Sequence, residues 1–103
     1  MTKVKIVETE ERVTILLKGH AEYDSTGRDI VCAACSVLAQ SLINALQVLE
    51  IPSSWRQLEG EMGLSFRKEG EWKGAYTMAK VGYEMLAKSY PRNVTVQTDE
   101  GAG

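Results

Sequence analysis

The chain has 103 residues, enough for one modest hydrophobic core, and we expect residues 1–103 to form a single domain. Charged residues make up 25% of the sequence and apolar residues 44%, a balance that excludes a disordered or fibrous protein. The formal net charge of -2 provides no basic surface, so direct binding of nucleic acid is not expected.

The first part of the chain predicts a β-hairpin. Residues 3–8 and 13–18 are rich in β-branched and apolar side chains, and Glu10, Glu11 and Arg12 separate them. Charged residues interrupt the apolar ones throughout residues 1–18, which excludes the continuous apolar core of a signal peptide. We therefore expect a cytoplasmic protein, in which the two cysteines are thiols and do not form a structural disulfide.

A loop and a long helix follow. Residues 19–29 are polar and contain glycine, so they predict a mobile loop that carries the active site. Residues 30–49 carry apolar side chains at helical spacing, with Asp29 at the N-cap position and Pro52 just beyond the end. The helix has no charged residue, yet its recurring Ser, Asn and Gln side chains favour burial over a membrane span. Because a chain of this size cannot cover such a helix on several sides, the sequence predicts a homodimer and no membrane.

The second half predicts two short strands, a helix and a last strand. The strands are expected at residues 55–59 and 62–68, the helix at 72–90, the last strand at 94–98 and a frayed tail at 99–103. The helix carries an aromatic stripe of Trp72, Tyr76, Tyr83 and Tyr90, which is expected to pack against a sheet. The order β-β-α-β-β-α-β predicts an α/β fold of the α+β type, with a sheet and helices in two layers.

Residues 19–36 hold the only histidine and both cysteines of the chain. If Asp29 caps the helix, Cys32 is its third residue, where unpaired backbone N–H groups and the positive end of the helix dipole favour a thiolate. His20 follows a predicted strand, and the loop after it allows its imidazole to approach the sulfur. A single histidine or a cysteine on a helix is more often a surface or packing residue. Their joint placement nevertheless favours a cysteine peptidase whose working pair is His20 and Cys32.

Asp29, Ser36 and Cys35 accompany this pair. The carboxylate of Asp29 favours the thiol form of a nearby cysteine, unless it caps the helix or orients His20. Ser36 lies one turn after Cys32, where it can hydrogen-bond within the same site. Cys35 is expected to fill the core as a small apolar residue, and a role as redox partner of Cys32 stays open.

Two other chemistries use the same residue types. His20-Ala21-Glu22 followed by Cys32 and Cys35 imitates the zinc-binding motifs of nucleobase deaminases, but residues 23–31 are too few for the helix and strand that separate those motifs. A C-x-x-C pair at a helix start is also the thioredoxin arrangement, but the long loop before it does not fit that fold. We therefore expect neither a metal nor a cofactor.

Gly19-His20-Ala21, followed by Gly27-Arg28-Asp29-Ile30-Val31-Cys32-Ala33-Ala34 and Ser36, strongly resembles the ribosomal-processing cysteine protease family called Prp. The resemblance spans the chain and implies a homodimeric bacterial enzyme that removes a short N-terminal extension from a large-subunit ribosomal protein. That extension is apolar and ends in paired aromatic residues. The resemblance implies Cys32 as nucleophile and His20 as general base, with Gly19, Asp29 and Ser36 as supporting positions. The family usually has an aliphatic residue at position 35, so its mechanism does not require Cys35.

Two functions outside the peptidase class remain as alternatives. One is a ribosome-associated module that binds a partner protein without catalysis, and the other is a C-x-x-C thiol redox protein. A binding module needs no hyperreactive thiol, so alkylation of the cysteines at neutral pH distinguishes it from a peptidase.

Overall fold

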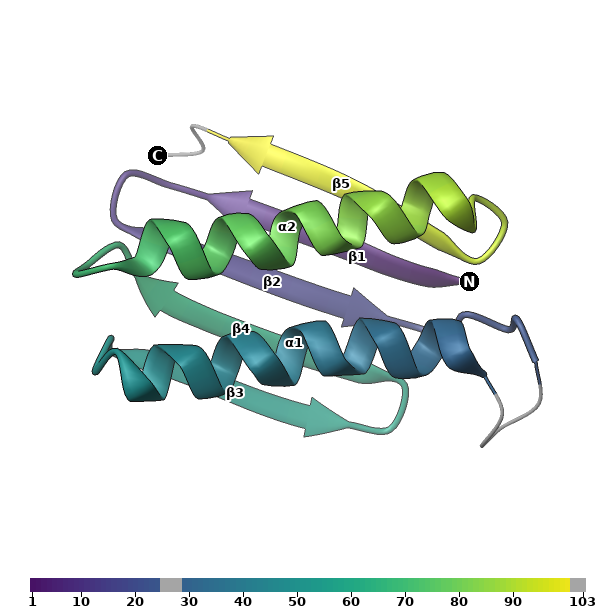
Figure 1. Ribbon diagram of the computed structural model, residues 1–103, viewed down its shortest axis with the longest axis horizontal. Coiled ribbons are helices and arrows are strands. Elements are labelled where there is room, and N and C mark those ends of the chain that lie inside the picture. Colours follow the sequence, from purple (N-terminus) through teal and green to yellow (C-terminus); the bar gives the residue numbers. More distant parts are fainter. Residues whose placement is uncertain (25–28, 101–103) are drawn as a thin grey trace.

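The computed structural model describes residues 1–24 and 29–100. Its elements are β1 (Thr2–Glu8), β2 (Arg12–Lys18), α1 (Ile30–Val48), β3 (Ser53–Leu58), β4 (Glu61–Arg67), α2 (Trp72–Ser89) and β5 (Val94–Glu100). The strands form one five-stranded sheet in the order β3-β4-β2-β1-β5, and both helices cover the same face of it (Figure 1). The predicted order of elements and the two-layer α+β architecture are confirmed. Part of the predicted loop, residues 25–28, and residues 101–103 of the predicted tail lie outside the described residues.

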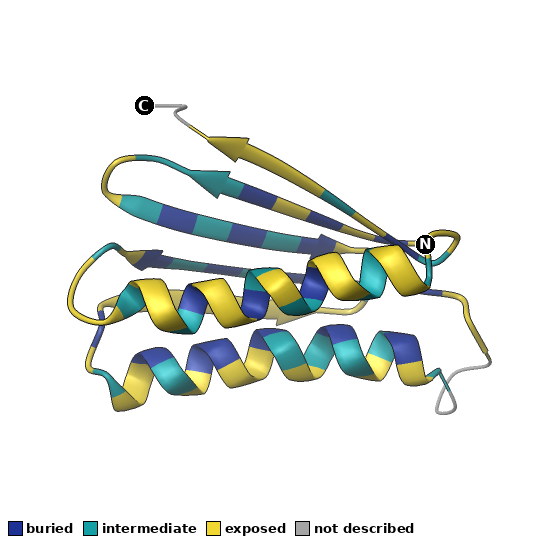
Figure 2. Cartoon of the chain, turned by 45° about the horizontal axis from the view of Figure 1, so that its top comes forward, coloured by how far each residue is buried: buried dark blue, intermediate teal, exposed yellow. Residues whose placement is uncertain are grey.

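The core lies between the sheet and the helices. Buried and less buried residues alternate along β1, β2 and β4 (Figure 2). Because successive side chains of a strand point to opposite faces, the buried ones lie on the face that the helices cover. Ile6 and Ile15 pair across the hairpin and are fully buried, and Leu64 continues the same row on β4. The period of two that predicts the hairpin therefore also determines which face is covered.

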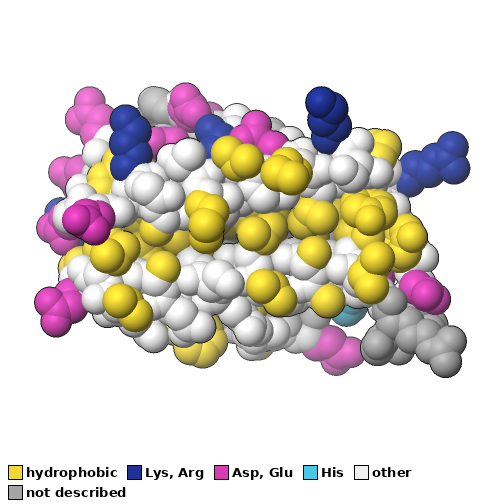
Figure 3. All heavy atoms as spheres, viewed as in Figure 1, with side chains coloured by type: hydrophobic (Ala, Val, Ile, Leu, Met, Phe, Trp, Pro, Cys, Tyr) yellow, Lys and Arg dark blue, Asp and Glu magenta, His cyan; other side chains and the backbone are white. Residues whose placement is uncertain are grey.

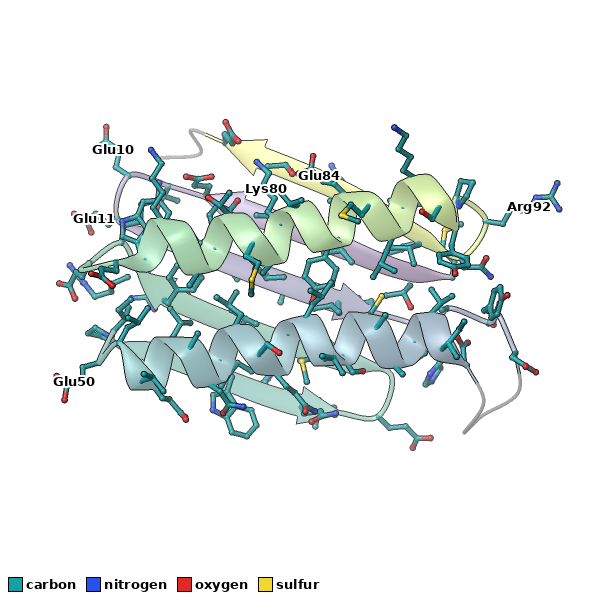
Figure 4. The ribbon with its side chains drawn as sticks, viewed as in Figure 1. Glu10, Glu11, Glu50, Lys80, Glu84 and Arg92 are labelled. Carbon is teal, nitrogen blue, oxygen red and sulfur yellow. The ribbon has the colours of Figure 1, made fainter. Side chains whose placement is uncertain are left out.

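The last strand differs from the prediction in length and depends on pairing that the local sequence does not reveal. β5 lies parallel to β1 at the edge of the sheet, and the chain reaches it by the crossover through α2. The predicted strand ended at residue 98, but Asp99 pairs with Val7 and Glu100 pairs with Glu8. The prediction of a tail beginning at residue 99 was therefore wrong by two residues. Figure 4 shows Lys80 on the β5 side of α2, and its Nζ lies 3.4 Å from Glu100 Oε1.

The C-terminal cap of α1 determines where the chain turns to begin β3. The backbone of Glu50 has a φ of 57°, its N–H donates to Gln47 O at 3.1 Å, and the N–H of Ile51 donates to Leu46 O at 2.9 Å. These are the two bonds of a Schellman C-cap, which ends the helix at Val48. β3 then begins at Ser53, two residues earlier than predicted.

α1 is covered on one side, against the expectation that it would be surrounded. Its buried residues are Val31, Cys35, Ala39, Leu42, Ile43 and Leu46, whereas Ile30, Val37 and Val48 are exposed on the opposite side. The helix is long and apolar enough to cross a membrane, a criterion that a core helix of a globular protein also meets, and 33% of it is buried. The uncovered apolar residues are the feature that the single chain leaves unexplained.

α2 packs by its aromatic stripe, as predicted. Tyr76 and Tyr83 are buried, and Trp72 and Tyr90 pack against the core at the two ends of the helix. Gly82 faces α1 so closely that a Cβ there would lie 2.7 Å from Leu38 Cδ2. The absence of a side chain at Gly82 is what allows the two helices to lie next to each other at this point.

Candidate active site

A cavity of about 130 Å³ lies where the end of β2, the first turns of α1 and the β3–β4 turn meet. Of the predicted site residues, Gly19, His20, Cys32, Cys35 and Ser36 line it. Asp29 joins the site through a hydrogen bond to the backbone of Cys32. The fold thus brings the loop after β2 and the start of α1 to one place, although residues 25–28 between them are not described.

Gly19 sets the path of the chain toward His20. Its φ of +85° is unfavourable for any residue with a side chain, and a Cβ there would overlap the carbonyl oxygen of Met1. Its N–H donates to Gly60 O at 2.8 Å, which ties the end of β2 to the β3–β4 turn. A Cβ on Gly60 would lie only 3.4 Å from His20 Nε2, so the imidazole lies directly against this turn. Glycine at position 19 is therefore a structural requirement for the placement of His20.

Asp29 acts as the N-cap of α1. Its Oδ1 accepts from the N–H of Cys32 at 2.8 Å, and its Oδ2 accepts from the N–H of Tyr23 at 3.0 Å. Desolvation raises the pKa of Asp29, but the backbone hydrogen bonds that its carboxylate accepts, foremost those from Cys32 and Tyr23, together outweigh it and hold that pKa below its usual range. Of the two roles considered for Asp29, capping is the one for which the structure gives contacts.

The two cysteines occupy different surroundings. Cys32 is partly exposed at the cavity, whereas Cys35 is buried at 2% exposure. Desolvation, with a smaller effect of Cys32 and Asp29, raises the pKa of Cys35 to about 11. A thiol with this pKa stays protonated at neutral pH, which fits the interpretation of Cys35 as a packing residue.

The start of α1 offers fewer free donors than its position suggests. The N–H of Cys32 is taken by the Asp29 side chain, and the N–H of Ala33 donates to the Asp29 carbonyl at 3.0 Å. An oxyanion formed at the cavity would therefore need a donor other than these two groups. The hydroxyl of Ser36 and the amide of Gln57 are side-chain donors in the cavity wall.

Several residues of the cavity were not found from the sequence. Gln57, Leu58 and Gly60 reach it because β3 and β4 turn back beside α1, and Thr2 forms part of its floor at the start of β1. The Oγ1 of Thr2 is buried and has no hydrogen-bond partner among the residues that the structure describes. Of these four residues, only Gly60 had a signal in the sequence, as a predicted turn residue. The other three come next to Cys32 through strand pairing, which their local sequence does not reveal.

Of the deaminase-like residues, His20, Cys32 and Cys35 line the cavity and Glu22 does not. Glu22 is exposed and lies 3.4 Å from the N-terminal amino group, so it pairs with a cation of the chain itself. Over residues 1–24 and 29–100, no three or more His, Cys, Asp and Glu side chains form a cluster that could hold a metal ion. The cavity therefore presents a partly exposed thiol and an imidazole as its reactive groups.

Comparison with known proteins gives the chain a family. The model of the family described as cysteine protease Prp matches residues 1–95. An essential ribosomal processing protease Prp from S. aureus, solved with a covalently linked product peptide, is similar with 21% identity and a TM-score of 0.87, covering 96% of this chain and 100% of that one. The S. aureus protease with a substrate peptide is similar at 20% identity and a TM-score of 0.76, with coverage of 96% and 100%. A protein from Streptococcus mutans matches at 24% identity and a TM-score of 0.76, covering 97% of this chain and 95% of that one.

No curated protein matches the chain. At these levels of identity the solved structures establish the fold, whereas the family match extends over nearly the whole sequence. The chain belongs to the cysteine protease Prp family and is therefore a cysteine peptidase.

Proposed function

We propose that this peptidase works with a Cys-His dyad in which Cys32 is the nucleophile and His20 is the general base and acid. The observation that carries the proposal is that both side chains line one cavity, at the start of α1 and beside the β3–β4 turn. His20 is the only histidine of the chain, and the other cysteine is buried. No other pair of residues in the described chain combines an accessible thiol with an imidazole.

The dyad supports acyl transfer in two steps. The Cys32 thiolate attacks the carbonyl carbon of the scissile bond, and protonated His20 gives its proton to the leaving amine as the peptide bond breaks. A water molecule then attacks the resulting thioester while His20 accepts its proton, which releases the carboxylic acid and restores the pair. We expect Ser36 and Gln57, whose side chains carry hydrogen-bond donors and which line the cavity, to donate to the oxyanion of each tetrahedral intermediate.

The supporting residues act through position. Gly19 permits the turn that brings His20 to the cavity, and Asp29 fixes the first turn of α1 by binding the backbone of Cys32. Both carboxylate oxygens of Asp29 accept backbone N–H groups, and the dipoles of these groups partly offset the negative potential of the carboxylate near the sulfur. This arrangement reduces the repulsion that a free carboxylate would exert on a Cys32 thiolate.

The substrate we propose is the apolar N-terminal extension of a large-subunit ribosomal protein, cleaved behind its paired aromatic residues. The resemblance to the Prp family and the likeness to S. aureus Prp bound to substrate and product peptides support it. Cleavage of a newly made ribosomal protein takes place where ribosomes are assembled, so we place the enzyme in the cytoplasm and treat residues 1–103 as one protease domain.

We also propose that the enzyme is a homodimer. Exposed apolar side chains run along the outward surface of the helix layer (Figure 3): Ile30, Val37, Val48, Met78, Val81 and Met85. A second copy that packs on this surface would remove it from water, which is the usual fate of an extended apolar patch. Light scattering at micromolar concentration should give twice the chain mass, and replacing both Met78 and Met85 by glutamate should give the monomer. A monomeric wild type would contradict the proposal.

The dyad is tested with a synthetic peptide that spans the extension and the first residues of the mature ribosomal protein. Cys32→Ala should abolish cleavage and retain the fold, because alanine is favourable in a helix. His20→Ala should lose most of the activity and shift alkylation of Cys32 by iodoacetamide to higher pH, since an imidazolium partner favours the thiolate. Cys35→Val is the matched control and should cleave as the wild type does. Wild-type cleavage by Cys32→Ala would refute the dyad.

A further inference from the structure

A second cavity, of about 190 Å³, continues the catalytic one along the edge of the sheet. It lies between α1 and β3 and is lined by Gln40, Ile43, Asn44, Trp55, Gln57 and Met62. Gln57 and Met62 also line the cavity that holds Cys32, so the two are adjacent. We call the two together the α1–β3 groove. It leads from the nucleophile along β3 toward Ser53.

β3 is an open edge of the sheet. All six of its residues are exposed, including Trp55 at 53% and Leu58 at 57%, and Arg56 is its only charged residue. The opposite edge, β5, ends in Asp99 and Glu100. Charged residues on an edge strand hinder pairing with another chain, and β3 has little of this protection. An unprotected edge beside the catalytic cavity is what a peptide needs in order to bind as an added strand.

At alternate residues of β3, the backbone N–H and C=O groups point to that edge. The N–H of Arg67 donates to Pro52 O at 3.1 Å, and Ser53 is in register with Phe66. In an antiparallel ladder, bonded and non-bonded pairs alternate, so Trp55 and Gln57 direct their backbone N–H and C=O groups away from β4. Their side chains line the α1–β3 groove. One peptide can therefore pair with the backbone of these two residues and place side chains against the same groove.

We propose that the substrate peptide binds as a sixth strand on β3, with apolar side chains that precede the scissile bond held in the α1–β3 groove against Trp55. This inference rests on the proposed function and adds the place and mode of substrate binding. β3 runs toward the cavity that holds Cys32, so the residues before the scissile bond lie parallel to β3. Trp55, Ile43 and Met62 supply apolar surface, and Gln40 and Asn44 supply amides that can bond the peptide backbone.

The test measures binding of the fluorescently labelled extension peptide to Cys32→Ala and its cleavage by proteins that retain Cys32. Gln40→Trp, which fills the groove from α1, should weaken binding and reduce kcat/KM by about tenfold or more, and Trp55→Ala should act in the same direction. Glu84→Trp is the control, an exposed position on the β5 side of α2 (Figure 4), outside the groove and outside the proposed dimer surface, and should behave as the wild type. Alkylation of Cys32 should be equal in all of the variants that retain it, which would show that the catalytic cavity is intact.

A second measurement examines the peptide backbone. Methylation of single peptide nitrogens should weaken binding at every second residue before the scissile bond, because only alternate N–H groups of an edge strand face the partner. Equal cleavage of the peptide by Gln40→Trp and the wild type would refute the α1–β3 groove as the binding site, and it would not affect the proposal of the Cys-His dyad. If Gln40→Trp weakens binding of the peptide but the wild type does not cleave it, the proposed function is refuted and the groove is supported. A changed mass in light scattering with unchanged peptide binding would assign the β3 edge to a second copy of the chain and overturn the proposal.

Discussion

Replacing Thr2 by valine is expected to stabilise the protein. Thr2 is 3% exposed, and its Oγ1 lacks a hydrogen-bond partner among the described residues. A buried hydroxyl without a partner costs about 1–3 kcal/mol, and valine has nearly the same shape and favours strands. We expect the free energy of unfolding to rise by about 1 kcal/mol or more. For a domain of this length each kcal/mol raises Tm by about 4–8 °C.

Urea denaturation followed by circular dichroism measures the change as a higher midpoint with an unchanged m value. Thr95→Val is the control, because Thr95 is exposed on β5 and its hydroxyl has access to water, so its effect should stay within about 0.5 kcal/mol. Thr2 lines the cavity that holds Cys32, so an unchanged alkylation rate of Cys32 serves as the check that the substitution leaves the site intact. An unchanged or lower stability of Thr2→Val would show that the hydroxyl is satisfied in solution and would refute the reasoning.

Four further substitutions test the helix packing, one ion pair and the second cysteine. Gly74→Ala should stabilise α2 by about 0.5–1 kcal/mol, because a Cβ there meets nothing within 4 Å. The free energy of unfolding of Gly82→Ala should be lower than that of Gly74→Ala by about 1 kcal/mol or more, because its Cβ would overlap Leu38 of α1. Equal effects of the two substitutions in urea denaturation would contradict the close approach of the helices at Gly82. The hydrogen bond and charge of Lys68 lower the pKa of Glu8, so their contribution to stability is present above about pH 4.5, the unfolded value, and is lost as the pH falls through the folded value. Glu8→Gln should therefore lose up to about 1 kcal/mol at pH 7, and its difference from the wild type should shrink in acid; a difference independent of pH would exclude the pair as its cause. Cys35→Val and the wild type should recover activity equally after peroxide and a dithiol reductant, since the Cys35 thiol has a pKa of about 11; poorer recovery of the variant would indicate a redox switch.

The local sequence was sufficient for the elements and for the start of the site. Alternation in β1 and β2 determines their hairpin and its buried face, because a strand side chain can only point to one side or the other. Asp29 before an apolar helical repeat determines the N-cap, and with it the position of Cys32 in the first turn of α1. These features depend on neighbours within a few residues, so the sequence alone carries them.

The tertiary structure determined what lies around Cys32 and where strands end. Asp99 and Glu100 are polar and predicted a tail, yet they extend β5 because β1 offers a parallel partner along its whole length. Gln57 and Leu58 reach the catalytic cavity because β3 folds back beside α1, and nothing in their own segment signals it. Pairing between distant strands is a property of the sheet as a whole, so residues of ordinary composition become part of a site only when the sheet order is known.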